Sequence, residues 1–596
     1  MRSFNRAALA AFLCFPLSLT ADAVMDLDDT VTVTATRTPL SLEDALAPVI
    51  VITGDELRRT ATIDVAEALR FHAGIEIGRN GGPGQAASLF VRGTNSNHTQ
   101  VLVDGVRVNP GTLGAAAIHH VRPADIERIE IVKGPRSTLY GTEAIGGVVN
   151  IITRRATAPV TVDAELGIGA HGTRSAGASF KGRSAVWFGG LRADTLETDG
   201  FPPIIGSTIA RGYQNHTVHA HGGYQGDALR TEVRRWQATG NVEYVDFFGT
   251  PVDQDFDNHV TAAEAEWSTT RYRTLVRISR ANDEIRQRQS PDFAATARTN
   301  VDWQTDWQIA SAHELTTGAS VTRERTTAEV FGAAFDETPR TRAVFAQWQH
   351  QGERNRALVA VRHSDHDAFG GRFSSNAEVG RSLSERWGIV AGAGTAFRAP
   401  DSTQRFGFGG NPALEPEKSR NLEVGLRGRV GERTRLSWQL FENRIDDLIT
   451  FDLATFALEN IDRARIRGSE LTVTHRADRW VWRQSFVIQQ PLDLGTAEPL
   501  PRRARRSAQS SVQWRLNDAW SFGGDVLLTG KRKDSGFSPD FIPGYALVNL
   551  SAEWRFSGRW TADFRVENAL DAHYETALGF AQSGRALYGR VRWTNW

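Results

Sequence analysis

The stretch ADIERIEIVKGPRSTLYGTEAIGGVVNIITRR, residues 124–155, marks the point where one kind of sequence pattern gives way to another. Within it, three isoleucines are spaced to pack into a core, and Gly134-Pro135 ends their strand. Three glycines then permit close backbone approaches before the apolar strand Val148–Ile152. The isoleucines are Ile126, Ile129 and Ile131, and the glycines are Gly141, Gly146 and Gly147. The stretch predicts the last part of a small globular core.

Downstream of this stretch, from about residue 161, apolar and polar residues alternate along the chain. In VDAELGI, residues 162–168, every second side chain is apolar, and Asp163 and Glu165 lie between them. RLSWQL (435–440) and LVNLSAEWRF (547–556) alternate in the same way. This pattern predicts many strands, each with one apolar and one polar face.

The length of this second region decides what the strands build. Residues 156–596 have room for about 22 strands of roughly 9–11 residues with their turns and loops. No stretch has the roughly 20 consecutive apolar residues of a transmembrane helix, whereas a closed barrel spans a membrane with alternating sequence. We therefore expect an all-β transmembrane barrel of about 22 antiparallel strands. The alternative is a soluble propeller or solenoid, but we find no repeat of roughly 40–50 residues.

Upstream, residues 41–155 mix short strands with short helices, which predicts an α+β domain. Thr53 and Thr62 stand as N-caps before two helical patterns, GDELRR and IDVAEAL. The segment QVLVDGVRV contains two strand-like runs around Asp104-Gly105, which predicts a tight hairpin.

The N-terminus, residues 1–23, has the pattern of a secretory signal: two arginines, an apolar run too short to span a bilayer, and Ala21-Asp22-Ala23 as a cleavage site. Cys14, the only cysteine of the chain, lies inside this signal, so no disulfide is expected in the mature protein. With 69 Lys and Arg against 69 Asp and Glu, charge offers no argument for a nucleic-acid partner. We find no Walker-type loop, nucleophile elbow or zinc-ligand run, and therefore expect no enzyme and no catalytic residues.

Several motifs, in the right order, resemble those of the TonB-dependent outer-membrane receptors. Residues 124–155 resemble the end of that family's plug domain, and LFVRGTNSNHTQVLVDGVRVN resembles its middle. In the barrel region the similar segments are residues 394–426, ENRIDDLITF, ARIRGSELT and VENALDAHYE. The resemblance implies that residues 41–155 form a plug inside the lumen of the barrel. It also implies a monomer in the lipid of the outer membrane of a Gram-negative bacterium.

Residues 24–40 then correspond to the TonB box and a linker. The box comprises Asp29, Thr30, Val31, Thr32, Val33, Thr34 and Ala35. In the family this segment adds a strand to TonB, which the inner-membrane complex energises, and β-augmentation suits a β-prone segment near a chain end.

The plug segment RNGGPGQAASLFVRGTNSNH and the barrel segment GFGGNPALEPEKS resemble those of the family's cobalamin receptors, which implies a corrinoid ligand bound by two plug loops. Carried over by position, the ligand-binding residues are Asn80, Gln85, Ala86 and Ala87 in the first loop and Asn109, Thr112 and Leu113 in the second. Polar side chains there are suited to bind amides, and small ones leave room for a bulky ring. A ferric siderophore is the alternative ligand, and a passive porin is a further alternative.

Haem receptors share FRAP and NPAL segments with residues 397–400 and 411–414, but place an iron-binding histidine between them. The intervening sequence, DSTQRFGFGG, has no histidine, and we expect His119-His120 in the plug to lie in a solvated loop.

Cobalamin receptors also use loop aspartates to bind calcium. The acids available here are Asp199, Asp246, Asp253, Asp255 and Asp257. RGYQN occupies the place of paired aspartates, so we expect no metal and no cofactor, although calcium remains an alternative.

The resemblance also implies a lock between plug and barrel, in which Arg92 and Lys133 pair with Glu423 and Glu470. Lys133 stands where arginine is usual, and an ammonium cannot form the bidentate fork of a guanidinium, which predicts a weaker lock.

At the C-terminus, ALYGRVRWTNW allows two registers for the last strand. We expect the one that places Arg590 and Arg592 in the lumen, because an arginine facing lipid costs roughly 2–4 kcal/mol at the bilayer midplane.

Overall fold

The computed structural model describes residues 32–33, 37–38, 40–246, 249–452, 454–535 and 538–595, with the side chains of residues 32, 33 and 462 left out. The predicted signal and most of the predicted TonB box, Asp29 to Ala35, lie outside the described residues. Within the box, β1 (Thr32–Val33) pairs antiparallel with β2 (Leu40–Ser41).

The plug is built around a five-stranded sheet in the order β3-β8-β9-β6-β7. These strands are β3 (Val49–Thr53), β6 (Thr99–Val103), β7 (Val106–Arg107), β8 (Ile126–Lys133) and β9 (Gly147–Thr153). A separate hairpin joins β4 (Ile75–Arg79) to β5 (Ala87–Val91). The helices are α1 (Gly54–Thr60), α2 (Val65–Leu69) and α3 (Ser137–Tyr140), with 3-10 turns η1 (Ser96–His98), η2 (Ile118–His120) and η3 (Pro123–Asp125). The three isoleucines predicted to form the core, on β8, are buried.

The caps and the hairpin predicted from the sequence of the plug are confirmed, with one exception. Thr53 caps α1, because its hydroxyl accepts a hydrogen bond from the Glu56 amide at 3.2 Å. The prediction that Thr62 caps the second helix is wrong: Asp64 caps α2 through its carboxylate. The hairpin at Asp104-Gly105 is confirmed, since both residues have positive φ, 49° and 76°, as a type I′ turn requires.

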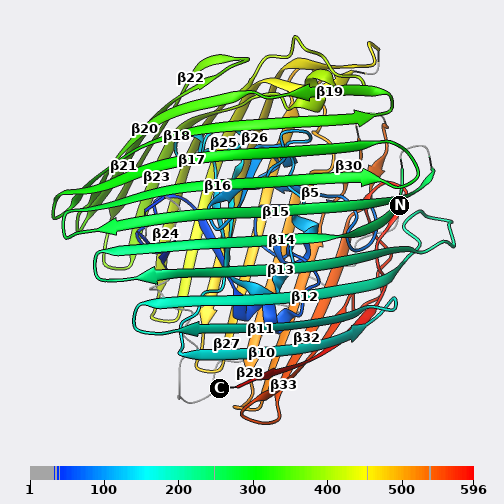
Figure 1. Cartoon of the computed structure of the whole chain (residues 1–596), viewed down its shortest axis with the longest axis horizontal. Coiled ribbons are helices and arrows are strands. Elements are labelled where there is room, and N and C mark those ends of the chain that lie inside the picture. Colours follow the sequence, from blue (N-terminus) through cyan, green and yellow to red (C-terminus); the bar gives the residue numbers. More distant parts are fainter. Residues whose placement is uncertain are drawn as a thin grey trace.

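The second region forms a closed antiparallel barrel (Figure 1). Twenty-three labelled strands take part. Because β19 and β20 follow each other in the chain and both pair with β18, they occupy one strand position, and the barrel has 22 strand positions around its wall. The prediction of about 22 strands is confirmed. The first half comprises β10 (Val160–Gly169), β11 (Arg174–Arg183), β12 (Trp187–Phe201), β13 (Arg211–Gln225), β14 (Leu229–Val245), β15 (Pro251–Ser268), β16 (Tyr272–Gln287), β17 (Phe293–Ala310), β18 (His313–Val330), β19 (Ala333–Glu337) and β20 (Arg340–Gln351).

The last strand closes the barrel by pairing with the first, β36 with β10. The second half comprises β21 (Asn355–His366), β22 (Gly370–Ser382), β23 (Trp387–Arg398), β24 (Glu417–Val430), β25 (Thr434–Asp452), β26 (Ala457–Arg476), β27 (Trp480–Asp493), β28 (Arg506–Arg515), β29 (Trp520–Thr529), β32 (Tyr545–Arg555), β33 (Trp560–Glu567) and β36 (Ala586–Thr594). The loops at one end carry α4 (Ser402–Phe406), β30 (Arg532–Lys533), β31 (Phe541–Ile542), β34 (Glu575–Ala577) and β35 (Phe580–Ala581).

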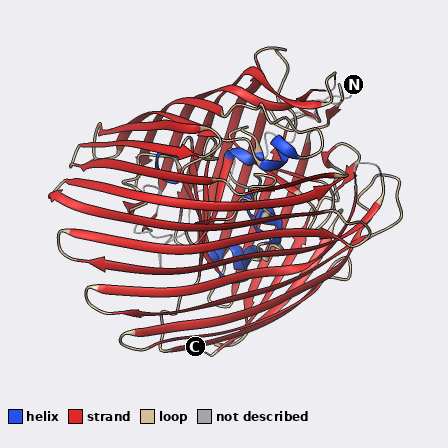
Figure 2. Ribbon diagram, turned by 45° about the horizontal axis from the view of Figure 1, so that its top comes forward, coloured by secondary structure: helices blue, strands red, loops and turns tan. Residues whose placement is uncertain are grey.

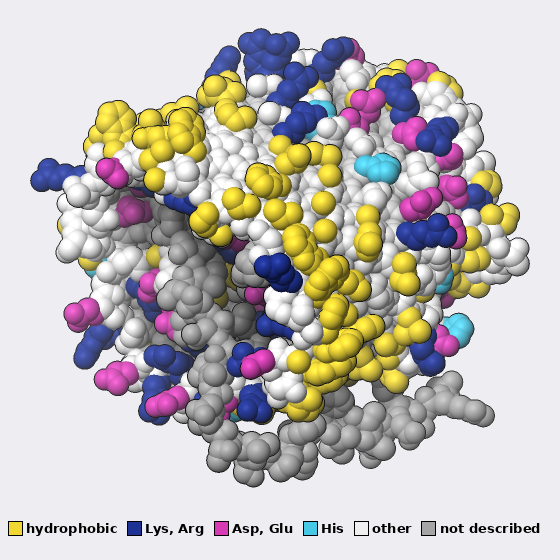
Figure 3. All heavy atoms as spheres, turned by 60° about the horizontal axis from the view of Figure 1, so that its bottom comes forward, with side chains coloured by type: hydrophobic (Ala, Val, Ile, Leu, Met, Phe, Trp, Pro, Cys, Tyr) yellow, Lys and Arg dark blue, Asp and Glu magenta, His cyan; other side chains and the backbone are white. Residues whose placement is uncertain are grey.

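Alternation along the strands separates the two faces of the barrel wall. Leu166 and Ile168, on β10, are 69% and 73% exposed, as expected for side chains that face outward. Figure 3 shows hydrophobic side chains gathered over part of the wall, with charged side chains toward its margins. On β36, Arg590 donates a hydrogen bond to the carbonyl oxygen of Arg58, in the plug, at 2.7 Å. The predicted register, with Arg590 inward, is confirmed.

The helices of the plug lie inside the ring of strands (Figure 2). Side chains of the plug accordingly form ion pairs with many barrel strands, so the globular domain fills the lumen. In the part of the chain that the structure describes, no helix is long and apolar enough to cross a membrane.

Candidate functional site

The predicted lock residues meet at one place between plug and barrel. Arg92 Nη1 lies 2.9 Å from Glu423 Oε2, and Arg92 Nη2 lies 3.3 Å from Glu470 Oε2. Lys133 Nζ lies 2.9 Å from the same Glu470 oxygen. All four side chains are at most 8% exposed. Since 331 or more residues separate the partners in the chain, only the plug's position in the lumen brings them together.

The backbone around Arg92 explains its placement. Arg92 follows β5 with a positive φ of 49°, and its amide donates to the carbonyl oxygen of Gly74 at 2.8 Å. Gly74 itself has a φ of 69°, and a Cβ there would overlap Glu470 Oε1. The guanidinium of Arg92 also lies 4.5 Å from the ring centroid of Phe441, a cation–π contact. The sequence motif VRG did not indicate that Gly74 and Phe441 complete the site.

The two cations of the lock differ in their electrostatic balance. Burial opposes the charge of Arg92, but Glu470 and Glu423 together raise the pKa of its guanidinium. Burial lowers the pKa of the Lys133 ammonium, and Glu470 offsets this only in part. Removing one partner of such a buried pair is costly, whereas the intact pair stabilises little relative to apolar packing. The contact therefore has the properties of one that can be separated as a unit.

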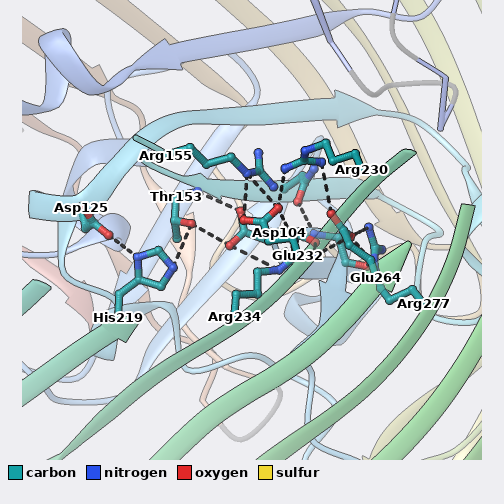
Figure 4. A network of polar contacts seen from close by, with 12 residues as sticks. Asp104, Asp125, Thr153, Arg155, His219, Arg230, Glu232, Arg234, Glu264 and Arg277 are labelled. Atoms are coloured by element: carbon teal, nitrogen blue, oxygen red, sulfur yellow. Dashed lines mark hydrogen bonds and ion pairs between the residues drawn. The ribbon is translucent and has the colours of Figure 1, made fainter. Parts of the chain in front are cut away.

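A second polar network, not expected from the sequence, joins the plug to β11 and β13 (Figure 4). Asp125, at the end of η3, accepts hydrogen bonds from Lys181 Nζ at 2.5 Å and from His219 Nδ1. His219 Nε2 lies 3.3 Å from the hydroxyl of Thr153, which donates to Asp104 at 2.7 Å. Burial opposes ionisation of Asp125, but the hydrogen bond from His219 and the charge of Lys181 hold its pKa below the usual range.

The network continues from the Asp104 hairpin to the neighbouring strands β14, β15 and β16 (Figure 4). Arg234 Nη2 donates to the Asp104 carbonyl oxygen at 2.8 Å and lies 3.1 Å from Glu264. Arg277 lies 3.0 Å from Glu264, and Arg155 of the plug lies 3.1 Å from Glu232. The plug is thus held by several separate groups of ion pairs around the wall.

At the loop end of the barrel, a buried chain of charges links the plug to the α4 loop. His98 Nε2 lies 2.9 Å from Glu417 Oε2, and the same oxygen lies 2.8 Å from Arg398 Nη1. Arg398 also lies 2.8 Å from Asp401, whose carboxylate caps α4. Arg398 belongs to the FRAP segment, so in this chain that segment anchors a loop to the plug.

The α4 loop also rests directly on the plug. The amides of Ser402 and Thr403, the first residues of the helix, donate to the carbonyl oxygens of Gly111 and Thr112 at 2.9 and 3.2 Å. These carbonyls belong to the second predicted ligand loop. The loop is therefore covered in part by α4, and movement of one is coupled to the other.

The first predicted ligand loop is only partly accessible. Gln85 is 2% exposed, and its amide donates to a barrel backbone carbonyl at 3.3 Å. Ala87 is 8% exposed and belongs to β5. Direct ligand contact by these two residues does not fit the structure, because protein atoms already surround them. Asn80 is half-buried and Ala86 is exposed, so both remain accessible.

The second predicted loop gives a similar correction. Asn109 is completely buried: its side-chain oxygen accepts from the Val101 amide at 2.7 Å, and its nitrogen donates to two backbone carbonyls. Thr112 is 1% exposed and its hydroxyl bonds to Thr296. Both residues shape the loop rather than face a ligand. Leu113 is 48% exposed and is the accessible residue of this set.

An aromatic cluster that the sequence analysis missed lies on the loops at the same end. Phe408 has ring centroids 5.9 Å from both Phe331 and Phe456, and Phe451 lies 5.2 Å from Phe456. Phe331, Phe408 and Phe456 are each more than half exposed. The segment RFGFGG carried this signal, since exposed phenylalanines next to glycines are unusual in a solvated loop.

Three of the five loop aspartates form contacts with arginine or histidine side chains. Arg288 Nη2 lies 2.7 Å from Asp255 Oδ1, and Arg288 Nη1 lies 3.3 Å from Asp253 Oδ2. Asp257 bonds to His259 at 3.0 Å. Among the described residues, no group of three or more acidic, histidine or cysteine side chains is arranged to hold a metal ion. Arg288 and His259 thus already contact the carboxylates of Asp253, Asp255 and Asp257.

The prediction of a solvated His119-His120 loop is wrong. His120 is 3% exposed, its ring stacks 3.6 Å from that of Phe256, and Nδ1 lies 3.1 Å from the Tyr213 hydroxyl. Burial lowers the pKa of His119 to about 4. The pair lies in the packed interface between η2 and the wall.

Comparison with known sequences agrees with this architecture. A family model described as "TonB dependent receptor-like, beta-barrel" matches residues 167–569, and one described as "TonB-dependent Receptor Plug Domain" matches residues 41–148. The chain is 29% identical to the vitamin B12 transporter BtuB of Vibrio vulnificus, over 100% of this chain and 98% of the relative. It is 28% identical to the protein of the same name from Photobacterium profundum, over 99% of each.

A solved structure shares the fold at lower sequence identity. The ferripyoverdine receptor of the outer membrane of Pseudomonas aeruginosa, solved bound to ferripyoverdine, has a TM-score of 0.81 and 16% identity to this chain. The alignment covers 96% of this chain and 90% of that receptor. At this identity the likeness concerns the fold alone.

Proposed function

Since the chain belongs to the TonB-dependent receptors of the outer membrane, we propose that it imports cobalamin or a related corrinoid through TonB. The single observation that carries the ligand class is the similarity to two vitamin B12 transporters over the full length of both. It covers plug and barrel together, and is therefore not a likeness of one domain.

The ligand surface we propose lies where the plug, the α4 loop and the aromatic cluster meet at the extracellular end. Its accessible members are Asn80 and Ala86 of the first loop, Leu113 of the second, and the exposed rings of Phe408 and Phe456. Large apolar and aromatic surface with few polar groups suits a bulky ring system that carries amides.

Release of the ligand follows from the contacts beneath this surface. In the proposed cycle, the ligand binds outside, TonB pairs with the segment Asp29–Ala35 in the periplasm, and force from the inner membrane displaces part of the plug. The ion pairs of Arg92 and Lys133 would separate in this step. No bond chemistry is required of any side chain.

Equilibrium binding to the purified full-length protein tests the ligand class. We expect cyanocobalamin to bind at least 100-fold more tightly than ferric enterobactin or ferripyoverdine, a difference of about 2.7 kcal/mol. Leu113→Asp should weaken corrinoid binding, whereas Asn109→Ala should act on stability first. Siderophore binding without corrinoid binding would reject the proposal.

Deletion of Asp29–Ala35 tests the energised mechanism separately. Uptake of labelled cobalamin by cells should fall to background while binding to the purified receptor stays unchanged. Unchanged uptake would instead indicate passive passage.

A ferric siderophore is the second candidate ligand. It is favoured by the fold shared with the ferripyoverdine receptor, but at 16% identity that likeness concerns the fold alone. The same binding experiment distinguishes the two candidates.

A further inference from the structure

Three arginines lie side by side on the outer face of the barrel, which is the face turned toward lipid. Arg420 of β24 pairs in register with Arg444 of β25, and Arg444 pairs with Arg465 of β26. We call these three residues the arginine row. Their neighbours along each strand, such as Asn421 and Asn443, are buried on the lumen side, so the row points outward. Like charges directly opposite one another in a sheet are destabilising.

Among the described side chains, carboxylates balance this charge only in part. Arg420 lies 3.2 Å from Asp446, and Arg444 lies 2.7 Å from Glu442, yet their side chains remain 76% and 63% exposed. Nε of Arg465 is buried with no hydrogen-bond partner among the described residues. The adjoining outward residues are Lys418, Arg463, Arg467, Glu442, Asp446 and Asp447. Six cations therefore stand against three carboxylates among the described side chains.

The height of the row places it at the outer surface of the membrane. Arg444 lies ten residues beyond Thr434, the first residue of β25 at the periplasmic turn. At about 3.3 Å per residue and a tilt of about 40°, it is about 25 Å above that turn. The apolar band of an outer-membrane barrel is also about 25 Å tall. The guanidiniums thus lie at the level of the outer-leaflet headgroups.

Directly below the row the barrel wall has a groove of about 1020 Å³. Small side chains, Ala377 and Ala393, form its floor, and Leu422, Leu440 and Ile488 stand at its sides. Leu422 and Ile488 are 64% and 60% exposed. Arg467, one row below Arg465, also lines the groove, as do Arg505, Arg506 and Glu442, which pairs in register with Arg467. The groove therefore presents mainly apolar surface, with three arginines and one outward carboxylate along it.

We propose that this surface, the arginine row with the groove beneath it, is a binding site for a phosphorylated, multiply acylated glycolipid of the outer leaflet. Phosphate groups accept paired hydrogen bonds from guanidiniums, and the acyl chains fill the groove. Charge complementarity favours this glycolipid over other occupants. An apolar transmembrane partner or a second barrel would leave the excess guanidiniums unpaired. The site does not depend on which substrate the receptor carries.

Native mass spectrometry of the full-length protein in detergent, titrated with bis-phosphorylated hexa-acyl lipid A, tests the proposal. We expect the triple variant Arg420→Ala, Arg444→Ala, Arg465→Ala to bind this lipid at least tenfold more weakly than the parent. The parent should bind dephosphorylated lipid A at least tenfold more weakly as well. Inorganic phosphate alone should not displace the lipid, because it cannot use the groove.

A matched control removes the same number of charges at the other membrane surface. Arg386, Arg479 and Arg559 are exposed in periplasmic turns, and their replacement by alanine should leave lipid binding unchanged. Heat-modifiable migration on gels checks that each barrel is folded. If the triple variant does not fold, the single variant Arg465→Gln replaces it in the binding experiment. Equal binding by parent and folded variant, equal binding of both lipids, or displacement by inorganic phosphate would overturn the proposal.

Discussion

His98 of the plug and Glu417 of β24, 319 positions apart in the chain, form a completely buried contact with 2.9 Å between Nε2 and Oε2. Glu417 also accepts hydrogen bonds from Arg398 and from the Ile449 amide. Because Arg398 reaches the cap of α4, the contact joins the plug to the loop that covers it. A ligand that displaces the loop would act on the plug through this carboxylate.

Replacing His98 tests that link. His98→Ala leaves Glu417 with two partners, so we expect a loss of about 1–3 kcal/mol in the free energy of unfolding, measured by denaturant titration. His216→Ala, at an exposed position on β13, is the control and should have little effect. Similar losses in both variants would contradict the structural role of His98.

Arg92→Ala should release the lock. Two buried carboxylates, Glu423 and Glu470, lose their shared partner, and we expect a destabilisation of about 3–5 kcal/mol. Hydrogen–deuterium exchange of the plug residues would report it as faster exchange in β4 and β5. Arg325→Ala, which breaks an exposed pair with Asp336, should leave that exchange unchanged. Equal exchange in the parent and in both variants would show that Arg92 does not stabilise the plug in the barrel.

Lys133→Arg should strengthen the lock, because a guanidinium offers two donors to Glu470 where the ammonium offers a single point contact. The force needed to extract the plug by its N-terminus, measured on single molecules, is expected to rise. Lys531→Arg, at an exposed loop position, is the control. If both variants behave like the parent, Lys133 does not limit plug release.

Gly74→Ala should damage the same site through backbone and contact together. The positive φ alone costs alanine about 1–2 kcal/mol, and the new Cβ would in addition displace Glu470. Gly431→Ala isolates the first effect, since Gly431 has a φ of 63° with no atom within 4 Å of its Cβ position. Thermal unfolding should therefore show a larger loss for Gly74→Ala. Equal losses would mean that Glu470 moves aside freely.

The partly buried carboxyl of Glu76, on β4, predicts a pH dependence of stability. Burial raises its pKa from 4.5 to about 7, although the Ala504 amide and Gln489 bond to it. Between pH 4.5 and pH 7 this carboxyl is ionised in the unfolded chain but still protonated in the folded protein. The free energy of unfolding therefore falls as pH rises through this range, by roughly 3 kcal/mol in all. Below pH 4.5 the group is protonated in both states and contributes no slope.

Glu76→Gln should remove this slope, so the variant should be more stable than the parent at pH 8 and similar at pH 5. Thermal unfolding at the two pH values measures the difference. The exposed plug residue Glu127, changed to glutamine, provides the control. A parent protein that is equally stable at both values would refute the assignment.

Local patterns in the sequence were enough for the architecture and for part of the site. Alternation with period two predicted the barrel, Asp104-Gly105 predicted a hairpin in the plug, and the resemblance to the receptor family implied Arg92 and Lys133 as lock residues. Each of these signals spans a few neighbouring positions. Thr62 failed as a cap because α2 begins only at Val65, where the Asp64 carboxylate accepts a hydrogen bond from the Glu67 amide.

The predicted ligand residues show what local sequence patterns cannot predict, which is the burial of a side chain in the folded protein. Position in a motif assigned Gln85, Asn109 and Thr112 to a ligand, but the structure buries all three side chains. Nothing near His119-His120 in the sequence indicated that Phe256 and Tyr213 would cover His120.

By itself, therefore, the sequence determined a small α+β domain followed by about 22 strands with one apolar face, because side-chain alternation and turn chemistry act between adjacent residues. That the domain lies inside the barrel was implied by the resemblance to the receptor family. Only the tertiary structure decided that His98 meets Glu417, that Gly74 leaves room for the lock, and that three arginines align across β24, β25 and β26. Those contacts depend on strand register and on the depth of the plug, and both are set by packing between segments hundreds of residues apart.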